Sequence, residues 1–259
     1  MAYIAGILIY PIKSLDGVGV NRARILASGA LESDREFAIV DAQGRFVNGK
    51  RNAKVHLLRS FWNETAKTVT LQIEGTEAKQ VFDLSQNRTE LEGTLSDYFG
   101  FSVQLARNSL TGFPDDTIAS GPTIISTATL EEVASWFPGI TVAEIRQRLR
   151  ANIEIGGVPA FWEDQLFADA DEIVQFKIGE VLFEGINPCQ RCIVPTRNSR
   201  TGESYPNFQK LFSQKREETL PSWVNLSRFN HFYRLSVNTK IPASEAGKMV
   251  QVGDEIERL

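Results

Sequence analysis

The chain has 259 residues, long enough for one large domain or two small ones. Hydrophobic residues make up 42% and charged residues 23%, close to the averages of globular proteins, which excludes disordered, coiled-coil and collagen-like chains. The 32 acidic residues outnumber the 28 basic ones and give a net charge of -4, so the chain has no positive excess for general binding to nucleic acid. An anionic ligand would have to be held by a few basic residues gathered in one pocket.

The number of cysteines and the composition of the N-terminal segment indicate the cellular compartment of the protein. Cys189 and Cys192 are the only cysteines, and they are too few and too close together for a disulfide scaffold. The apolar run over 4–12 has no basic residues before it and no small-residue cleavage pattern after it, and it is too short for a membrane span. We therefore expect a soluble cytoplasmic protein with no membrane span.

The first hundred residues consist of short β-rich runs separated by turn signals. They predict strands at 4–10, 21–27, 36–41, 45–48, 55–62, 68–74 and 80–84. Strands of this length and spacing are typical of a barrel or a sandwich. A helical pattern follows at 91–99, with Gly100 as its stop signal.

The rest of the chain mixes helices with further strands. Helices are predicted at 129–136, 142–149 and 206–218, and strands at 152–155, 173–178, 181–185, 232–238 and 250–256. The strands do not alternate regularly with long helices, which disfavours a doubly wound parallel sheet. The glycine-rich phosphate-binding motifs are also missing, so a Rossmann or P-loop enzyme is not expected.

The segment 187–195 carries both cysteines, on a loop predicted to leave a strand. A structural zinc site needs four ligands, and only His56 and His231 could complete it. A thioredoxin-like dithiol would need a helix after the first cysteine, which Pro195 opposes. Both interpretations are disfavoured but stay open beside two others. One is a single thiolate acting as a soft metal ligand or sulfur carrier, favoured by the adjacent Arg191, and the other is two buried cysteines without a role.

Several short motifs occur together in one order along the chain. The cysteine segment contains Pro188-Cys189-Gln190-Arg191-Cys192, followed by Pro195-Thr196 and Thr201-Gly202-Glu203. Elsewhere stand Tyr10-Pro11-Ile12-Lys13-Ser14, Gly17-Val18, Asp34-Arg35-Glu36-Phe37, Arg150-Ala151-Asn152-Ile153 and Trp162-Glu163-Asp164. This combination resembles the MOSC family, in the branch with an N-terminal β-barrel domain that includes the mitochondrial amidoxime-reducing component and its bacterial relatives.

The resemblance implies a fold and a function. The fold would be mostly β (α+β): an N-terminal β-barrel or sandwich domain over 1–100, packed on a MOSC β-barrel with peripheral helices over 101–259. The function would be that of a molybdenum cofactor-dependent oxidoreductase that reduces N-hydroxylated or N-oxygenated small molecules. Its electrons would come from a separate flavoprotein, ferredoxin or cytochrome-type protein. The alternative is a protein that binds the cofactor or carries persulfide sulfur.

The resemblance also implies a set of site residues. A molybdenum–molybdopterin cofactor carries a phosphate and an electron-rich metal centre, so it needs cationic and hydrogen-bonding groups. The candidates are Lys13, Ser14, Arg35, Ser126, Thr127, Arg150, Asn152 and Arg191. Ser126 and Thr127 equally suit the cap of the following helix.

The cysteines have unequal expected roles. The family match makes Cys192 the metal ligand and catalytic thiolate, although the reverse assignment with Cys189 stays open. We expect Cys192 to be partly accessible in a cleft and Cys189 to be more buried or directed toward the adjoining backbone. The same cleft should collect four residues distant in sequence: Lys13, Ser14, Arg35 and Arg150.

Two segments depart from the family pattern. One is Asn48-Gly49-Lys50-Arg51, where relatives often carry an arginine after a hairpin, so the basic contact expected there is open. The other is Thr196-Arg197-Asn198, where the family often has an aspartate after the proline.

Overall fold

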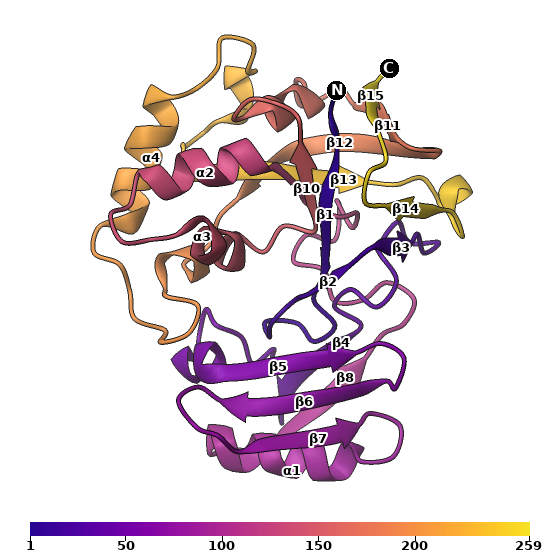
Figure 1. Ribbon diagram of the computed structural model, residues 1–259, viewed down its shortest axis with the longest axis vertical. Helices are drawn as coiled ribbons and strands as arrows, with labels where there is room; N and C mark the ends of the chain where they lie inside the picture. The colour runs from indigo at the N-terminus through magenta and orange to yellow at the C-terminus, as the bar shows by residue number, and fades with distance from the viewer.

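The computed structural model describes residues 1–259 and contains two units stacked on either side of a narrow waist (Figure 1). Both termini lie in the upper unit. Strands dominate and four α-helices accompany them, which confirms the mostly β, α+β class.

The upper unit is built on an eight-stranded sheet with the order β15-β11-β12-β13-β9-β10-β1-β2. Its strands are β1 (Tyr3–Ile9), β2 (Val18–Val20), β9 (Ile124–Ser126), β10 (Ile153–Gly156), β11 (Val174–Ile178), β12 (Val181–Gln190), β13 (Arg234–Lys240) and β15 (Ile256–Arg258). All neighbours are antiparallel except β9 and β10. A separate pair joins β3 (Arg22–Arg24) to β14 (Met249–Gln251).

Backbone hydrogen bonds between the two ends of the chain close this sheet into a barrel. The Ile4 amide donates to the Asp254 carbonyl at 2.9 Å, and the Ile256 amide donates to the Ala2 carbonyl at 3.0 Å. These bonds join β1 to the segment that enters β15, so the paired strands form a ring. Closure satisfies backbone groups that would otherwise be left at two sheet edges.

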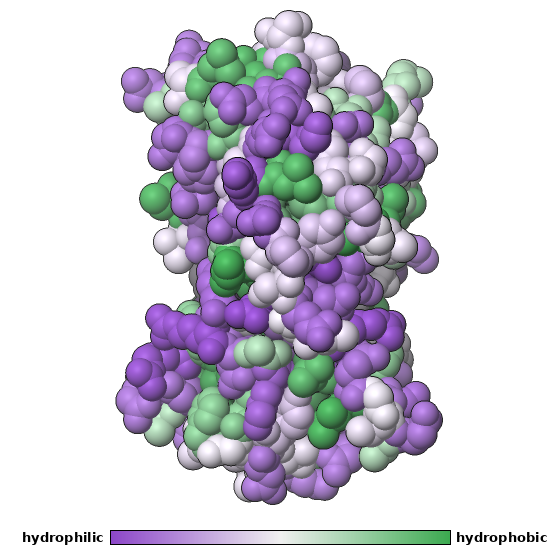
Figure 2. Space-filling model, turned by 90° about the vertical axis from the view of Figure 1, so that its left-hand side faces the viewer, coloured by the Kyte–Doolittle hydropathy of each residue, from purple (hydrophilic) through white to green (hydrophobic).

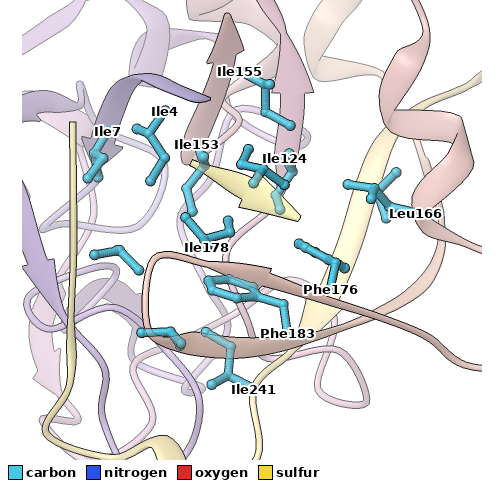
Figure 3. Packing of buried hydrophobic residues seen from close by; sticks show 14 of the residues in the cluster. Ile4, Ile7, Ile124, Ile153, Ile155, Leu166, Phe176, Ile178, Phe183 and Ile241 are labelled. Atoms are coloured by element: carbon cyan, nitrogen blue, oxygen red, sulfur yellow. The ribbon is translucent and has the colours of Figure 1, made fainter. Parts of the chain in front are cut away.

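The barrel interior is filled by branched and aromatic side chains. Ile124, Ile153, Phe176 and Phe183 come from four different strands and gather in one cluster (Figure 3). In β11, Phe176 and Ile178 are buried while Lys177 between them is exposed, which is the alternation that predicted this strand.

Three helices cover one side of the barrel (Figure 1). They are α2 (Thr127–Ser135), α3 (Val142–Leu149) and α4 (Phe208–Glu218). Phe137, which follows α2, stacks on Phe208 of α4 with ring centroids 4.2 Å apart. Short 3-10 helices complete the unit: η2 (Trp162–Leu166), η3 (Val194–Thr196), η4 (Leu226–Arg228) and η5 (Ala243–Glu245).

The lower unit has its own core. Its elements are β4 (Phe37–Asp41), η1 (Ala53–Leu57), β5 (Leu58–Asn63), β6 (Thr68–Ile73), β7 (Lys79–Asp83), α1 (Arg88–Phe99) and β8 (Val103–Arg107). The strands form one three-stranded sheet and the pair β4–β8. Leu91, Leu95 and Phe99 of α1 are buried in this core, and the helix ends at Gly100, whose φ of 83° suits glycine.

The two units do not follow one another along the chain, as a division between 1–100 and 101–259 would require. Strand β1 belongs to the upper barrel, because it pairs with β10. Strand β8 belongs to the lower unit, because it pairs with β4 although it lies after residue 100. The upper unit therefore combines both ends of the chain, and the lower unit is inserted into it.

Several predicted strands are shorter or interrupted. Only an isolated bridge at Phe46 forms within 45–48. The predicted strand at 55–62 begins as η1, because the Asn52 side chain accepts a hydrogen bond from the Lys54 amide and caps a helical turn. The predicted strand at 250–256 is split by a turn at Gly253, and β8 and β9 were not predicted.

Gly185 in β12 gives a test of the contact between the barrel and η2. A methyl group there would overlap the carbonyl oxygen of Leu166, and backbone atoms have little room to yield. We expect Gly185→Ala to lower the free energy of unfolding by about 3 kcal/mol in denaturant titration. Gly19→Ala is the control, since a methyl group at this strand position meets nothing within 4 Å. Equal stability of the two variants would contradict this packing.

A buried pair of carboxyl groups lies in η2. Asp164 forms an ion pair with Arg216, whose guanidinium is fully buried between the rings of Phe161 and Phe229. Neither carboxyl oxygen of Glu163 has a hydrogen-bond partner. Burial, together with the nearby charge of Asp164, raises the pKa of Glu163 to about 7.

This raised pKa predicts how stability depends on pH. The folded protein binds the Glu163 proton more tightly than the unfolded chain, so the stabilisation is complete below the unfolded pKa of 4.5 and is lost as the pH rises to about 7. Between about pH 5 and about pH 8, the wild type should lose about 2 to 3 kcal/mol relative to Glu163→Gln. Chemical unfolding at both pH values measures the difference, and parallel pH profiles would refute it.

Candidate functional site

A cleft of about 1270 Å³ lies between the two units, and residues from both line it. Figure 2 shows the narrowed waist, along which hydrophilic residues gather. Twelve lysine and arginine side chains line the cleft against four aspartates, although the whole chain is acidic. The fold therefore concentrates positive charge at this place.

Residues that are far apart in sequence meet in the cleft. Those predicted as site residues are Lys13, Ser14, Arg35, Arg150, Asn152, Arg191 and Cys192. Ser14, Arg35 and Arg150 all have left-handed backbones, with φ of 75°, 52° and 56°. Because only glycine and asparagine adopt this conformation readily, the surrounding structure must hold it at these three positions.

Tyr10, which directly follows β1, organises one end of the cleft. Its ring contacts two guanidinium groups, with Arg150 at 4.1 Å and Arg35 at 5.0 Å from the ring centroid. The Tyr10 hydroxyl donates to the Ala151 carbonyl at 3.3 Å. Gly17 packs against the ring so closely that a Cβ there would lie 2.5 Å from a ring carbon. No pattern in the sequence predicted that the Tyr10 ring lies between two arginines of the site.

Arg35 is fixed by two side chains. It forms an ion pair with Asp34, whose other carboxylate oxygen accepts the Tyr10 amide at 2.8 Å. Its guanidinium also donates to the Asn152 side-chain oxygen at 3.3 Å. The Asn152 amide nitrogen donates to the Leu8 carbonyl at 3.0 Å, so this buried asparagine ties Arg35 to β1. Asn152 positions Arg35 in addition to lining the cleft.

Arg150 is the C-cap residue of α3, and its guanidinium group has no ion-pair partner. Its backbone amide donates to the Arg146 carbonyl at 3.0 Å, while its Nη2 atom is buried without a hydrogen-bond partner. No carboxylate lies within 4.0 Å of this guanidinium, and burial lowers its pKa. A buried charge without a partner is costly, so an anion in the cleft would satisfy it.

Lys13 is neutralised within the cleft. Its Nζ donates to Asp115 at 2.7 Å and to the Phe113 carbonyl at 2.9 Å. Burial lowers the pKa of Lys13. Partial desolvation in the cleft opposes ionisation of Asp115, whose side chain is exposed, but the charge of Lys13 holds the pKa of Asp115 well below its usual range. Asp115 was not predicted, because 102 residues separate it from Lys13. Lys50 lies 4.0 Å from the same carboxylate and also lines the cleft.

Both cysteines line the cleft at the end of β12. Cys189 lies inside the strand and Cys192 just after it, and both side chains are half-buried. The Cys189 sulfur lies 3.8 Å from the Gln190 carbonyl oxygen, so this side chain is directed toward the adjoining backbone, which is one of the two placements expected for it. The strand register shifts between Pro188 and Gln190, and such irregularities redirect side chains.

Arg191 connects the cysteines to the Tyr10 end of the cleft. One of its nitrogens lies 3.3 Å from the Cys189 sulfur, and another donates to the Leu149 carbonyl, next to Arg150. The charge of Arg191 lies against Cys189 rather than against Cys192.

Two predicted ligands do not line the cleft. The Ser126 side chain is fully buried and accepts a hydrogen bond from the Thr129 amide at 3.1 Å, so it caps α2. The Thr127 hydroxyl donates to Glu154 at 2.9 Å. Ser126 therefore has the role that the capping interpretation predicts, whereas the Thr127 hydroxyl binds a carboxylate of β10.

Sequence reasoning missed most of the cleft arginines. Five of the ten have no carboxylate within 4.0 Å: Arg150, Arg191, Arg197, Arg228 and Arg234. The other five are paired with acidic side chains. Nowhere in the structure do three or more His, Cys, Asp or Glu side chains gather as a metal-binding group.

Comparison with known protein families identifies two domains in the chain. The MOSC N-terminal beta barrel domain matches residues 1–112, and the MOSC domain matches residues 122–257. The chain belongs to the MOSC family. No helix of this MOSC protein is both long enough and apolar enough to cross a bilayer.

Two curated proteins and one crystal structure are similar to the chain. Human molybdenum cofactor sulfurase is 23% identical over an alignment that covers 83% of this chain and 28% of that protein. The molybdenum cofactor sulfurase of Drosophila mojavensis is 25% identical, with 85% and 31% covered. The chain thus spans about a third of the length of these relatives. The crystal structure of the YUAD protein from Bacillus subtilis is 14% identical, covers 99% of this chain and 94% of its own, and has a TM-score of 0.45.

The unpaired guanidinium of Arg150 predicts anion-dependent stability. Inorganic phosphate should raise the Tm of the wild type above its value in sodium chloride of equal ionic strength, because an anion bound to the folded state stabilises it. Arg150→Met should lose at least about half of this rise. Arg22→Met, an exposed residue outside the cleft, should keep it. An equal rise in both variants would place the anion elsewhere.

Proposed function

We propose that this MOSC protein binds a molybdenum cofactor in the cleft and reduces N-hydroxylated or other N-oxygenated small molecules. One observation carries the proposal: two half-buried thiols line the same cleft as five arginines that have no carboxylate partner. The similarity to proteins named molybdenum cofactor sulfurase supports the choice of cofactor.

The residues fit the chemistry of molybdopterin. Its phosphate needs cationic donors, and the buried Nη2 of Arg150 lacks an acceptor. Arg35 and Lys13 lie in the same cleft, and Ser14 adds a hydroxyl. These residues would hold the phosphate and the pterin, with the Tyr10 ring keeping the two guanidinium groups apart.

The thiols fit a soft metal. Molybdenum prefers sulfur ligands, and Cys192 would supply one thiolate from the protein. Because the structure has no larger group of metal-ligating side chains, the remaining ligands would come from the cofactor. When bound, the cofactor supplies the two-electron redox chemistry that removes oxygen from the substrate.

The chain itself provides binding, orientation and access. The cleft is larger than the roughly 300–1,000 Å³ of common ligand pockets, which leaves room for a small substrate beside the cofactor. Electrons would come from a separate flavoprotein, ferredoxin or cytochrome-type protein, since the sequence has no nicotinamide or flavin fingerprint. We place this reaction in the cytoplasm as part of the same proposal.

A second candidate function is that of a sulfur carrier. The Cys189 sulfur lies 3.3 Å from an Arg191 nitrogen in the open cleft, where it could accept a sulfur atom from a donor persulfide and leave the donor as a thiol. The same relatives, named as sulfurases, are consistent with it.

Substitution of the two cysteines tests the reductase. After expression with ample molybdate, Cys192→Ser should lose bound molybdenum and amidoxime reduction with its fold intact, because a hydroxyl replaces the soft thiolate. Cys189→Ser is the matched control and should have a milder effect. Elemental analysis, turnover with a chemical reductant and circular dichroism provide the measurements.

Other outcomes have clear meanings. Full activity and metal content in Cys192→Ser would remove this residue from the mechanism. An inactive Cys189→Ser beside an active Cys192→Ser would assign the other sulfur. Metal-free wild type with cyanide-releasable sulfur would favour the carrier over the reductase.

A further inference from the structure

Two arginines form a second cationic group beside the cysteines. Arg228 lies in η4 and donates to the Ile186 carbonyl at 2.9 Å. Arg234 begins β13 and donates to the Pro188 carbonyl at 3.0 Å. Both are half-buried and line the cleft, and their anchors flank the strand segment that leads to Cys189.

Neither guanidinium forms an ion pair, although a hydrogen bond from Ser227 and, after it, the charge of Arg228 contribute to lowering the pKa of the more distant Asp169. Arg234 otherwise bonds only the neutral Asn230 and Gln190 side chains, and no carboxylate lies within 4.0 Å of either arginine. The two guanidinium groups are close enough that the charge of Arg228, after burial, contributes to lowering the pKa of Arg234. Adjacent like charges repel, so this arrangement costs stability unless an anion lies between them.

Other arginines of the cleft do have carboxylate partners. Arg146 pairs with Glu154 at 2.6 Å, and Arg148 pairs with Glu144 at 2.6 Å. Arg59 pairs with Asp16 at 3.0 Å. Arg228 and Arg234 lack such a partner, so their charges are available to an anion in the cleft.

This pair is distinct from the cationic group assigned to the cofactor. Arg35 and Arg150 are held on the Tyr10 ring, whereas Arg228 and Arg234 are anchored on the backbone of β12. The cysteine segment, with Arg191, lies between the two sets of contacts, since Arg191 touches both the Cys189 sulfur and the Leu149 carbonyl. A molecule reacting near the cysteines would meet Arg228 and Arg234 on the side away from the Tyr10 ring.

We infer that Arg228 and Arg234 bind an acidic group on the substrate, so that the preferred substrates are N-oxygenated molecules carrying a carboxylate or a phosphate. Guanidinium groups match the geometry of both acidic groups. This inference rests on the proposed reductase function and adds the substrate class to it. The protein would then bind the acidic group of the substrate at a different place in the cleft from the N–O bond that is reduced.

The test compares substrates that differ in one charged group. Molybdenum-loaded protein is assayed with benzamidoxime, which is neutral, and with its 4-carboxy and 4-phosphono derivatives. We expect kcat/KM to be at least about tenfold higher for an acidic derivative than for the neutral compound. Arg228→Gln and Arg234→Gln should each abolish most of this preference through KM.

Controls separate charge recognition from other effects. Arg22→Gln removes one exposed positive charge outside the cleft and should keep the preference. Arg228→Lys retains the charge and should keep part of it. Circular dichroism and bound molybdenum and pterin are measured for every variant. Calorimetric binding of the three compounds gives a readout that does not depend on turnover.

The outcomes distinguish this inference from the reductase itself. Equal kcat/KM for neutral and acidic compounds in the wild type would overturn the inference and leave the reductase standing. Loss of molybdenum or pterin from Arg228→Gln or Arg234→Gln would also overturn it, because the arginines would then hold the cofactor. Preferential binding of the acidic compounds without any turnover would support the anion site and refute the reductase.

Discussion

The backbone hydrogen bonds that join residues 2–4 to residues 253–256 are the constraint on which the site depends. They fix β1 as a member of the upper barrel, and the chain leaves this strand directly into the cleft. Tyr10 and Lys13 therefore start from a rigid strand rather than from a free loop. Because the lower unit is inserted after this segment, the cleft forms where the chain passes from one core to the other.

The sequence predicted the fold class and most elements. Strands whose side chains alternate, such as β11, were found because alternation reflects burial on one face. Helix α3 was predicted with its observed bounds, since Thr141 caps it and its apolar residues recur on one face. The insertion of one unit into the other could not be predicted, because strand pairing between β1 and β10 joins residues about 150 positions apart and leaves no local pattern.

The site residues that belong to short sequence motifs were predicted. Those whose role depends on contacts with residues distant in sequence were missed. Resemblance to a family indicated Lys13, Arg35 and Cys192, which the fold brings to one cleft. It gave no indication of Asp115 or Arg234, whose importance comes from neighbours distant in sequence. The direction of the Cys189 side chain depends on a register shift in β12, and nothing in the order of residues reveals such a shift.

The left-handed backbone at Ser14, Arg35 and Arg150 has a consequence for the evolution of the protein. Each costs on the order of 1 kcal/mol that a glycine would not, so the chain is less stable than its architecture allows. The chain carries larger side chains at three positions where glycine would give a more stable fold. Stabilising substitutions at these positions would come at the expense of the cleft, and variants selected only for heat resistance should drift toward glycine or asparagine there.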